Sequence, residues 1–364
     1  MKRPSIRILN AKGSPEAIGY LHGSQYAEEI QQYAEDRISL VTAGSWSGAP
    51  MTRIDIHDLA ESMISAHREF NEELFAELTA LAQGARISVA EAIIVGGFTD
   101  FVDAVRAETG GGIPSELQED DCTAVLVPNS RSGGSGFLAQ TWDMHDTATD
   151  HVLLLRLQPD NSPAAIIFTT TGCLGQIGMN EYGVAVGINN LTGGDGQRGV
   201  TWTSVVRGML EEETANAALQ VLLEADLAGA HNYLIMDKAG NGFNVEAMPS
   251  IRPVQELHND PIVHTNHVVT PSAKAVQAER PEDLLMNSTK RLNRGTELLK
   301  NGEVDTQRLV ELTQDQEAIC RKPVEPHLIE SSGAAIMRPA TKEFWACWGQ
   351  PSENDYELIG WADD

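Results

Sequence analysis

The spacing of the apolar residues changes once along this chain, about a third of the way in, and this change limits the fold more than any other feature. Residues 14–40, 55–83 and 88–101 carry apolar side chains at helical spacing. Ser14 precedes a proline at the first helical position, and Ser88 opens a capping-box sequence, so both residues mark helix starts. The first third of the chain is therefore expected to be helical.

From residue 122 the apolar residues follow the two-residue period of β-strands. Strands are expected at 122–128, 136–144, 151–158, 164–171 and 183–190, and later at 233–237, 242–247, just before His264, 333–338 and 343–348. Helices are expected at 201–213, 214–226, 281–300 and 305–318. This order of helices, strand meander, helices and strands predicts an α+β fold in which two antiparallel sheets lie between helical layers.

A connector, residues 106–121, joins the two parts of the chain. It contains three consecutive glycines, a proline and five carboxylates, which are typical of an exposed, flexible segment. Nothing in the pattern indicates that residues 1–121 fold alone. We expect them to cover one side of the sheets that residues 122–364 form, so that the whole chain is one folding unit.

The charge of the chain narrows the class of partner. The 364 residues carry a net charge of -26, which would repel nucleic acid and anionic membrane surfaces. No apolar stretch reaches the roughly 18 residues of a membrane span, and the N-terminus lacks the apolar core of a signal peptide. The four cysteines form no CxxC pair, so we expect reduced thiols in a cytoplasmic protein.

Cys122 stands where the helical pattern gives way to the strand pattern. The acidic connector delivers it onto the first strand of the β-rich part. One interpretation is a buried core thiol, because cysteine packs well in cores. The other is that Cys122 becomes a chain terminus after cleavage, with its own α-amine as the base.

Seven short motifs in order resemble one enzyme family. They are residues 13–23 (GSPEAIGYLHG), 121–123 (DCT), 140–143 (QTWD), 178–186 (GMNEYGVAV), 264–267 (HTNH), 288–291 (STKR) and 319–321 (ICR). Together they resemble the acyl-coenzyme A:6-aminopenicillanic acid acyltransferase (isopenicillin N acyltransferase-like) family of N-terminal-nucleophile hydrolases. The resemblance implies a four-layer αββα sandwich and a precursor that cuts itself between Asp121 and Cys122.

The resemblance also implies roles for individual residues. Cys122 would be the nucleophile, Asp143 would orient its freed amine, and Asn266 would stabilise the oxyanion. Two departures from the family pattern stand out. The junction is Asp121-Cys122, where the family often has Gly-Cys, and Gln140 stands where related hydrolases carry an arginine.

Several further residues are candidates for substrate binding. Asn189 or Asn190 would donate a hydrogen bond to substrate or oxyanion, with Asn189 preferred, although an Asn pair is also ordinary turn chemistry. Ser288 and Arg291 lie one helical turn apart and would reach the site from the helical layer, unless they are a cap-like serine and a solvated arginine. Trp142 would line an acyl pocket or pack in the core.

His264 and His267 allow a rival hypothesis of a metal site. Such a site needs two or three further ligands at recognisable spacing, which the sequence does not offer, so no metal and no other cofactor is expected.

The expected function is a self-processing cysteine amidohydrolase that cleaves a linear amide or N-acyl amine through a thioester on Cys122. One alternative is an acyltransferase that moves an acyl group from a thioester such as acyl-coenzyme A to an amine. Another is an uncleaved, non-catalytic binding protein. The expected partners are a small-molecule amide and the two chains of one precursor, and a homo-oligomer is compatible with the sequence.

Overall fold

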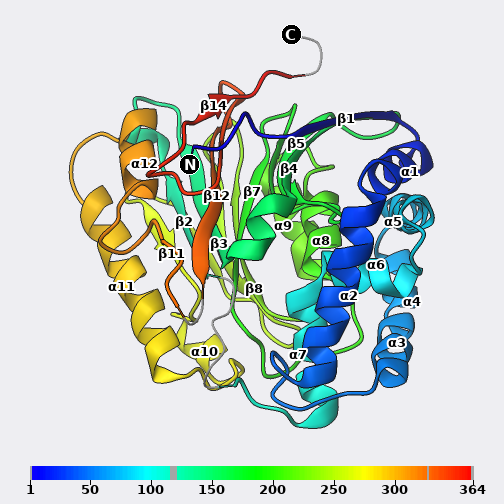
Figure 1. The fold of residues 1–364 in the computed structure, drawn as a ribbon. Coiled ribbons are helices and arrows are strands. Elements are labelled where there is room, and N and C mark those ends of the chain that lie inside the picture. Colours follow the sequence, from blue (N-terminus) through cyan, green and yellow to red (C-terminus); the bar gives the residue numbers. More distant parts are fainter. Residues whose placement is uncertain (1, 115–120, 326–327, 362–364) are drawn as a thin grey trace.

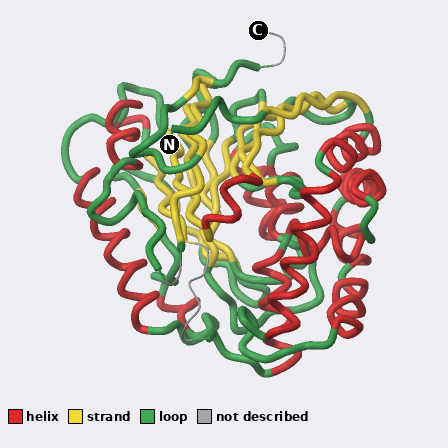
Figure 2. Tube along the Cα trace, in the orientation of Figure 1, coloured by secondary structure: helices red, strands yellow, loops and turns green. Residues whose placement is uncertain are grey.

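The computed structural model of the chain describes residues 2–114, 121–325 and 328–361. Two β-sheets stack face to face, and helices cover the outer face of each sheet (Figure 1). Figure 2 shows the strands gathered in the middle of the molecule, with most helices on the outer side of the larger sheet. This arrangement confirms the four-layer αββα architecture.

The larger sheet has eight strands in the order β1-β4-β5-β6-β7-β8-β9-β10. Their bounds are β1 (Ile8–Gly13), β4 (Val152–Pro159), β5 (Ala165–Thr170), β6 (Ile177–Asn180), β7 (Ala185–Asn190), β8 (His231–Met236), β9 (Gly242–Ala247) and β10 (Val254–Glu256). The prediction that both sheets are antiparallel is wrong for this one. Strand β1 runs parallel to β4, with Ile8 opposite Leu154, so the sheet is mixed.

The smaller sheet has six strands, all antiparallel, in the order β11-β2-β3-β12-β13-β14. Their bounds are β11 (Ile262–His264), β2 (Asp121–Val127), β3 (Phe137–His145), β12 (Ile329–Arg338), β13 (Glu343–Trp348) and β14 (Glu357–Leu358). Strands β2 and β3 lie side by side in the middle of this sheet and carry the candidate nucleophile and Asp143.

The helices fall into two groups. The group over the larger sheet is α1 (Pro15–Gln25), α2 (Ala27–Ala43), α3 (Arg53–Ser62), α4 (Ile64–Phe70), α5 (Glu72–Ala85), α6 (Val89–Gly96), α7 (Phe98–Thr109), α8 (Trp202–Met209) and α9 (Ala215–Glu224). Helices α11 (Glu282–Leu299) and α12 (Thr306–Thr313) cover the smaller sheet, and the short α10 (Pro271–Lys274) precedes them. The helical stretch expected at 14–40 is divided into α1 and α2, and the helices expected within 55–83 correspond to α3, α4 and α5.

Local sequence signals explain several helix starts. Ser14 accepts a hydrogen bond from Ala17 N at 3.3 Å, and Ser88 and Glu91 form the complete capping box. The connector is shorter than the expected 106–121, because α7 continues to Thr109 and Asp121 already belongs to β2. Of the residues between these two elements, 115–120 lie outside the part of the chain that the structure describes.

The apolar residues form separate cores between the layers. One core lies between the sheets and includes Cys122, Leu138, Phe168 and Leu234. Another lies between the larger sheet and its helices, and a third lies between the smaller sheet and α12. Strand β2 alternates accordingly, with Cys122 on the side of the inter-sheet core and Val125 in the core that α12 covers.

Within the described residues, no helix by itself has the length and hydropathy to cross a membrane. Helices α5 and α6 reach that length and hydropathy only when taken together, and they are bent by 104° relative to each other.

Candidate active site

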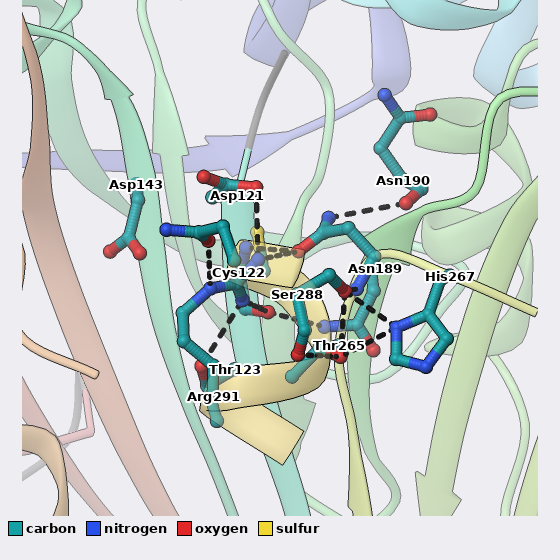
Figure 3. Close-up of polar contacts among 12 residues, drawn as sticks. Asp121, Cys122, Thr123, Asp143, Asn189, Asn190, Thr265, His267, Ser288 and Arg291 are labelled. Atoms are coloured by element: carbon teal, nitrogen blue, oxygen red, sulfur yellow. Dashed lines mark hydrogen bonds and ion pairs between the residues drawn. The ribbon is translucent and has the colours of Figure 1, made fainter. Parts of the chain in front are cut away.

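The main chain of Cys122 is held on both sides by side chains from other elements. Cys122 N donates to Asn266 Oδ1 at 2.7 Å. Cys122 O accepts from Arg291 Nη1 at 2.6 Å and from Asn189 Nδ2 at 3.3 Å (Figure 3). Asp121 and Cys122 are consecutive residues of β2 here, so the structure describes the uncut chain. The N–H of the predicted cleavage junction is therefore held by Asn266, and the carbonyl of Cys122, in the next peptide, is held by Arg291 and Asn189.

Asn266 lies in the loop after β11, and the neighbouring helix positions it. Ser288 Oγ, on α11, accepts from Asn266 N at 2.9 Å and contacts His267 Nδ1 at 2.7 Å. Asn266 Nδ2 donates to Asn190 O at 3.1 Å (Figure 3). Ser288 thus supports Asn266, which differs from its expected role in substrate binding. In the uncut chain Asn266 presents its oxygen to Cys122, so its role as oxyanion donor stays a prediction.

The two asparagines at the end of β7 have different roles. Asn189 points its Nδ2 at Cys122 O, as described above. The side chain of Asn190 instead accepts from Thr192 N at 3.3 Å, and its main-chain oxygen reaches Asn266. The preference for Asn189 as the side chain that reaches the site agrees with this geometry.

A chain of buried polar groups lies behind Asn189. Asn189 Oδ1 accepts from Asn232 Nδ2 at 3.3 Å and lies 3.2 Å from His264 Nδ1. His264 Nε2 lies 3.0 Å from Glu246 Oε1. Both ring nitrogens of His264 therefore face side-chain oxygen atoms.

The surroundings of Glu246 favour its ionised form. Burial alone would raise the pKa of Glu246, but hydrogen bonds from His264, Thr270 and the Val269 backbone, together with the charge of His264, lower it to about 2. The pKa of His267 is lowered to about 4, chiefly by burial, so this second histidine is neutral near pH 7. The two histidines of the HTNH motif thus differ in their partners, because His264 faces Glu246 whereas His267 contacts Ser288.

Asp143 lies directly opposite Asp121 on the neighbouring strand, and Trp142 lies opposite Cys122. The Oδ1 atom of Asp143 accepts from Ser331 Oγ at 2.7 Å. Burial raises the pKa of Asp143 to about 7, although the nearby Arg291 and Arg321 and the hydrogen bond from Ser331 oppose the rise. Figure 3 shows its carboxyl apart from the contacts around Cys122, so its contact with a freed amine stays a prediction.

Asp121 is enclosed by two arginines. Arg291 Nη2 donates to Asp121 Oδ1 at 2.9 Å, and Arg321 Nη1 donates to Asp121 Oδ2. The aspartate is buried, and Arg291 is among the largest fully buried side chains of the protein. The alternative that Arg291 is solvated is therefore wrong, because the helix turns it inward toward β2.

Trp142 and Gln140 point into the space between the sheets. Trp142 is buried and meets Phe168 edge-on, with 6.3 Å between ring centroids. This contact is core packing, and the acyl-pocket role of Trp142 stays a prediction. Gln140 Nε2 donates to Ile188 O at 2.5 Å, and Ile188 N donates to Gln140 Oε1 at 2.8 Å. Gln140 therefore links β3 to β7 at the position where related hydrolases carry an arginine.

Three residues of the site were missed as functional candidates, Glu246, Arg321 and Ser331, and His264 was considered only as a metal ligand. His264 and Arg321 stood inside quoted motifs, so their presence there was a usable signal. Nothing in the sequence distinguishes Glu246 or Ser331. Among the described residues, no group of three or more His, Cys, Asp and Glu side chains is arranged to hold a metal ion.

Comparisons with known proteins agree with the motifs. The model of the family described as "Acyl-coenzyme A:6-aminopenicillanic acid acyl-transferase" matches residues 130–353, more than half of the chain. Asp143, Asn266 and Arg291 lie inside this range, and Cys122 lies just before it. The acyl-coenzyme A:6-aminopenicillanic-acid-acyltransferase 40 kDa form of Emericella nidulans is 23% identical over 320 residues, which cover 86% of this chain and 84% of that protein.

Two solved structures are similar to part of the chain. A mutant of the conjugated bile acid hydrolase of Clostridium perfringens has a TM-score of 0.46 at 11% identity, covering 66% of this chain and 96% of that one. The Caenorhabditis elegans ortholog of N-acylethanolamine-hydrolyzing acid amidase has a TM-score of 0.45 at 14% identity, covering 60% and 93%. From the extent of the family match, the chain belongs to the acyl-coenzyme A:6-aminopenicillanic acid acyl-transferase family.

Proposed function

We propose that this protein is a self-processing cysteine amidohydrolase whose nucleophile is Cys122. The observation that carries the proposal is the set of three side chains on the Cys122 main chain. Asn266 binds the N–H of Cys122, which belongs to the junction amide. Asn189 and Arg291 bind the carbonyl of Cys122, which belongs to the next peptide. A strand residue needs no such set, because β-strand neighbours ordinarily satisfy its backbone groups.

The self-cleavage step uses the uncut geometry. The Cys122 thiol attacks the carbonyl carbon of Asp121, the C–N bond breaks, and the departing nitrogen takes up a proton to become the α-amine of Cys122. Water then hydrolyses the resulting thioester, which releases the Asp121 carboxylate and restores the thiol. The ordinary pKa of an α-amine is near 8 and that of a thiol is about 8.5, so the new amine can accept the thiol proton.

Turnover repeats the same chemistry on a substrate amide. The thiolate attacks the amide carbonyl, the amine leaves with a proton, and an acyl-thioester forms on Cys122. Asn266 Oδ1 already accepts from the nitrogen of Cys122, so it would orient the amine after cleavage. Water completes the hydrolysis. An amine that replaced water would make the same protein an acyltransferase, the activity named for the Emericella nidulans relative.

Denaturing gel electrophoresis with N-terminal sequencing tests the proposal. The wild-type chain should give two fragments, 1–121 and 122–364, whereas Cys122→Ala should stay intact and inactive. Cys173→Ala is the matched control, because Cys173 is equally buried but contacts the carbonyls of Gly96 and Gly175, away from the junction. Mass spectrometry with a panel of N-acyl amines should then find the acyl group on Cys122.

The outcomes separate the candidate functions. An intact wild-type chain without an acyl adduct would refute the enzyme in favour of a binding protein. An adduct that is discharged faster by added amines than by water would favour acyl transfer over hydrolysis.

A further inference from the structure

The aspartate before the cleavage junction occupies a built anion site. Each of its two carboxylate oxygens meets a different guanidinium: Oδ1 meets Arg291 and Oδ2 meets Arg321. The side chains of Asp121, Arg291 and Arg321 are 3%, 0% and 17% exposed. Asp121 therefore does more than replace the small glycine common in this family, because its carboxylate fills a pocket that two cations form.

In the self-cleavage thioester, Asp121 is itself the acyl group on Cys122. This step rests on the proposed function. The acyl chain runs from the thioester carbonyl through Cα and Cβ to the carboxylate, which is the four-carbon skeleton of a succinyl group. A substrate acyl group bound to the same sulfur places its carbonyl carbon where that of Asp121 was. Its third and fourth carbons then extend toward the same two arginines.

Hydrolysis of the thioester frees Asp121 from Cys122 and makes it the end of the first fragment. When its side chain leaves the site, Arg291 and Arg321 lose the carboxylate that it supplied. Arg291 also donates to neutral oxygens, including those of Cys122, Thr123 and Asn266. Two guanidinium groups that converge on one position favour an anion of matching shape there, because charge-assisted hydrogen bonds to a carboxylate are strong.

We propose that the processed enzyme is selective for amides of four-carbon dicarboxylic acids, of the N-succinyl type. Arg321 is the residue that sets this selectivity. Arg291 also holds the main chain of Cys122, whereas Arg321 reaches the junction through the side chain of Asp121. The substrate acyl group thus matches Asp121 of the precursor in the length of its carbon chain and in its terminal carboxylate.

The test compares two amides that share one fluorogenic amine, N-succinyl- and N-butyryl-7-amino-4-methylcoumarin. The kcat/KM of the processed wild type should be about tenfold or more higher for the succinyl amide, as expected of charge-assisted hydrogen bonds. In Arg321→Gln the ratio should fall to near unity. Lys322→Gln is the matched control, because it removes the neighbouring positive charge, which pairs with Glu353 at the surface, and it should keep the wild-type ratio.

The mass of the adduct on Cys122 separates failure of this inference from failure of the proposed function. A processed enzyme that forms both adducts with equal efficiency, or keeps its preference in Arg321→Gln, overturns the selectivity and leaves the amidohydrolase in place. A chain that stays uncut and forms neither adduct overturns both. A succinyl preference that depends on Arg321 but not on Lys322 supports the inference.

Discussion

Opposing effects of the surroundings determine the pKa of Asp143. Its burial favours the neutral acid, while the two arginines that hold Asp121 favour the carboxylate, and the balance places its pKa at about 7. Asp121 is itself among the causes that raise this pKa, because two carboxylates near each other resist a second charge. When Asp121 leaves after cleavage, the ionised form of Asp143 should therefore be favoured. At that stage the new α-ammonium group of Cys122 needs a counter-ion.

The pKa of Asp143 makes the stability of the uncut chain depend on pH. Its folded-state pKa lies above the ordinary value of 3.8, so between about pH 4 and pH 7 only the folded state holds this proton. The free energy of unfolding should therefore fall as pH rises through this window, by up to about 1.4 kcal/mol per pH unit. Asp143→Asn in a Cys122→Ala background should lack this contribution, and urea unfolding at several pH values measures it.

The comparison isolates one group because the two proteins share all other titrations. The Asn variant should gain stability relative to its Cys122→Ala parent as pH rises from about 4 to about 7, and the difference should then level off. A difference that stays constant with pH would contradict a raised pKa. Asp146→Asn, at a partly exposed position just after β3, serves as the control and should show no such gain.

At the scale of single residues, the sequence predicted which residues belong to the site but not which groups their side chains contact. The motifs named Cys122, Asn266 and Arg291, because each motif keeps its side chains at fixed local spacing. The partners of the carboxylates come from far away in the chain: Ser331 is 188 residues from Asp143, and Arg321 is 200 residues from Asp121. Local periodicity carries no information on contacts of this range.

The elements around Asn189 form a polar path through both sheets. Asn189 lies on β7, Asn232 on β8, Glu246 on β9 and His264 on β11 of the other sheet. Glu246 holds the His264 ring through Nε2, and His264 Nδ1 and Asn232 Nδ2 both contact Asn189 Oδ1. These contacts keep the oxygen of Asn189 away from Cys122 and its NH₂ group toward Cys122.

Glu246→Gln should lower the rate of acylation of Cys122 by roughly 10- to 100-fold, because a misdirected amide donor is lost. Stopped-flow measurement of the acylation rate checks this effect. The control is Glu256→Gln on the exposed strand β10. An unchanged rate in Glu246→Gln would show that Asn189 keeps its orientation without the Glu246–His264 contact.

Much of the element order could be predicted from the sequence, but some boundaries and the strands β1, β6, β10 and β14 could not. Strand β1 was missed because its six residues carry only a weak alternation and lie just before a helix, and it is held by parallel pairing with β4, a long-range contact. The boundaries of the helices expected within 55–83 were not predicted from the sequence, and there Asn71 accepts from Leu74 N at 3.0 Å and begins a new helix. An asparagine inside an apolar helical pattern was the available signal.

At the scale of the whole molecule, the two predicted fragments form a single folded body. Strand β1 of the first fragment is an edge of the larger sheet, and Asp100 on α7 accepts from Trp202 N at 2.7 Å in the second fragment. Asp103 on the same helix accepts from Gly193 N at 2.9 Å and Ala230 N at 3.1 Å. These contacts join the two fragments, and the expectation that residues 1–121 do not fold alone stays a prediction.

The fragments should therefore stay together after cleavage. Buried charge pairs between them should contribute more to the stability of the complex than exposed pairs. Glu77 binds Arg207 through two hydrogen bonds of 2.9 and 3.0 Å, with both side chains 4% exposed. Glu77→Gln leaves the buried Arg207 without its carboxylate and should destabilise the complex by about 3–5 kcal/mol. Arg198→Gln breaks the pair with Glu108 across the same boundary, but those side chains are 53% and 49% exposed, so it should cost under about 1 kcal/mol.

Size-exclusion chromatography of the processed protein in increasing urea measures both effects. The wild type and Arg198→Gln should elute as one species up to nearly the same urea concentration, whereas Glu77→Gln should release the first fragment at a distinctly lower one. Equal sensitivity of the two variants would mean that the Glu77–Arg207 pair adds nothing beyond an exposed pair. Separation of the wild-type fragments in buffer alone would contradict the single folding unit, because the larger sheet would then survive without β1 and its helical cover.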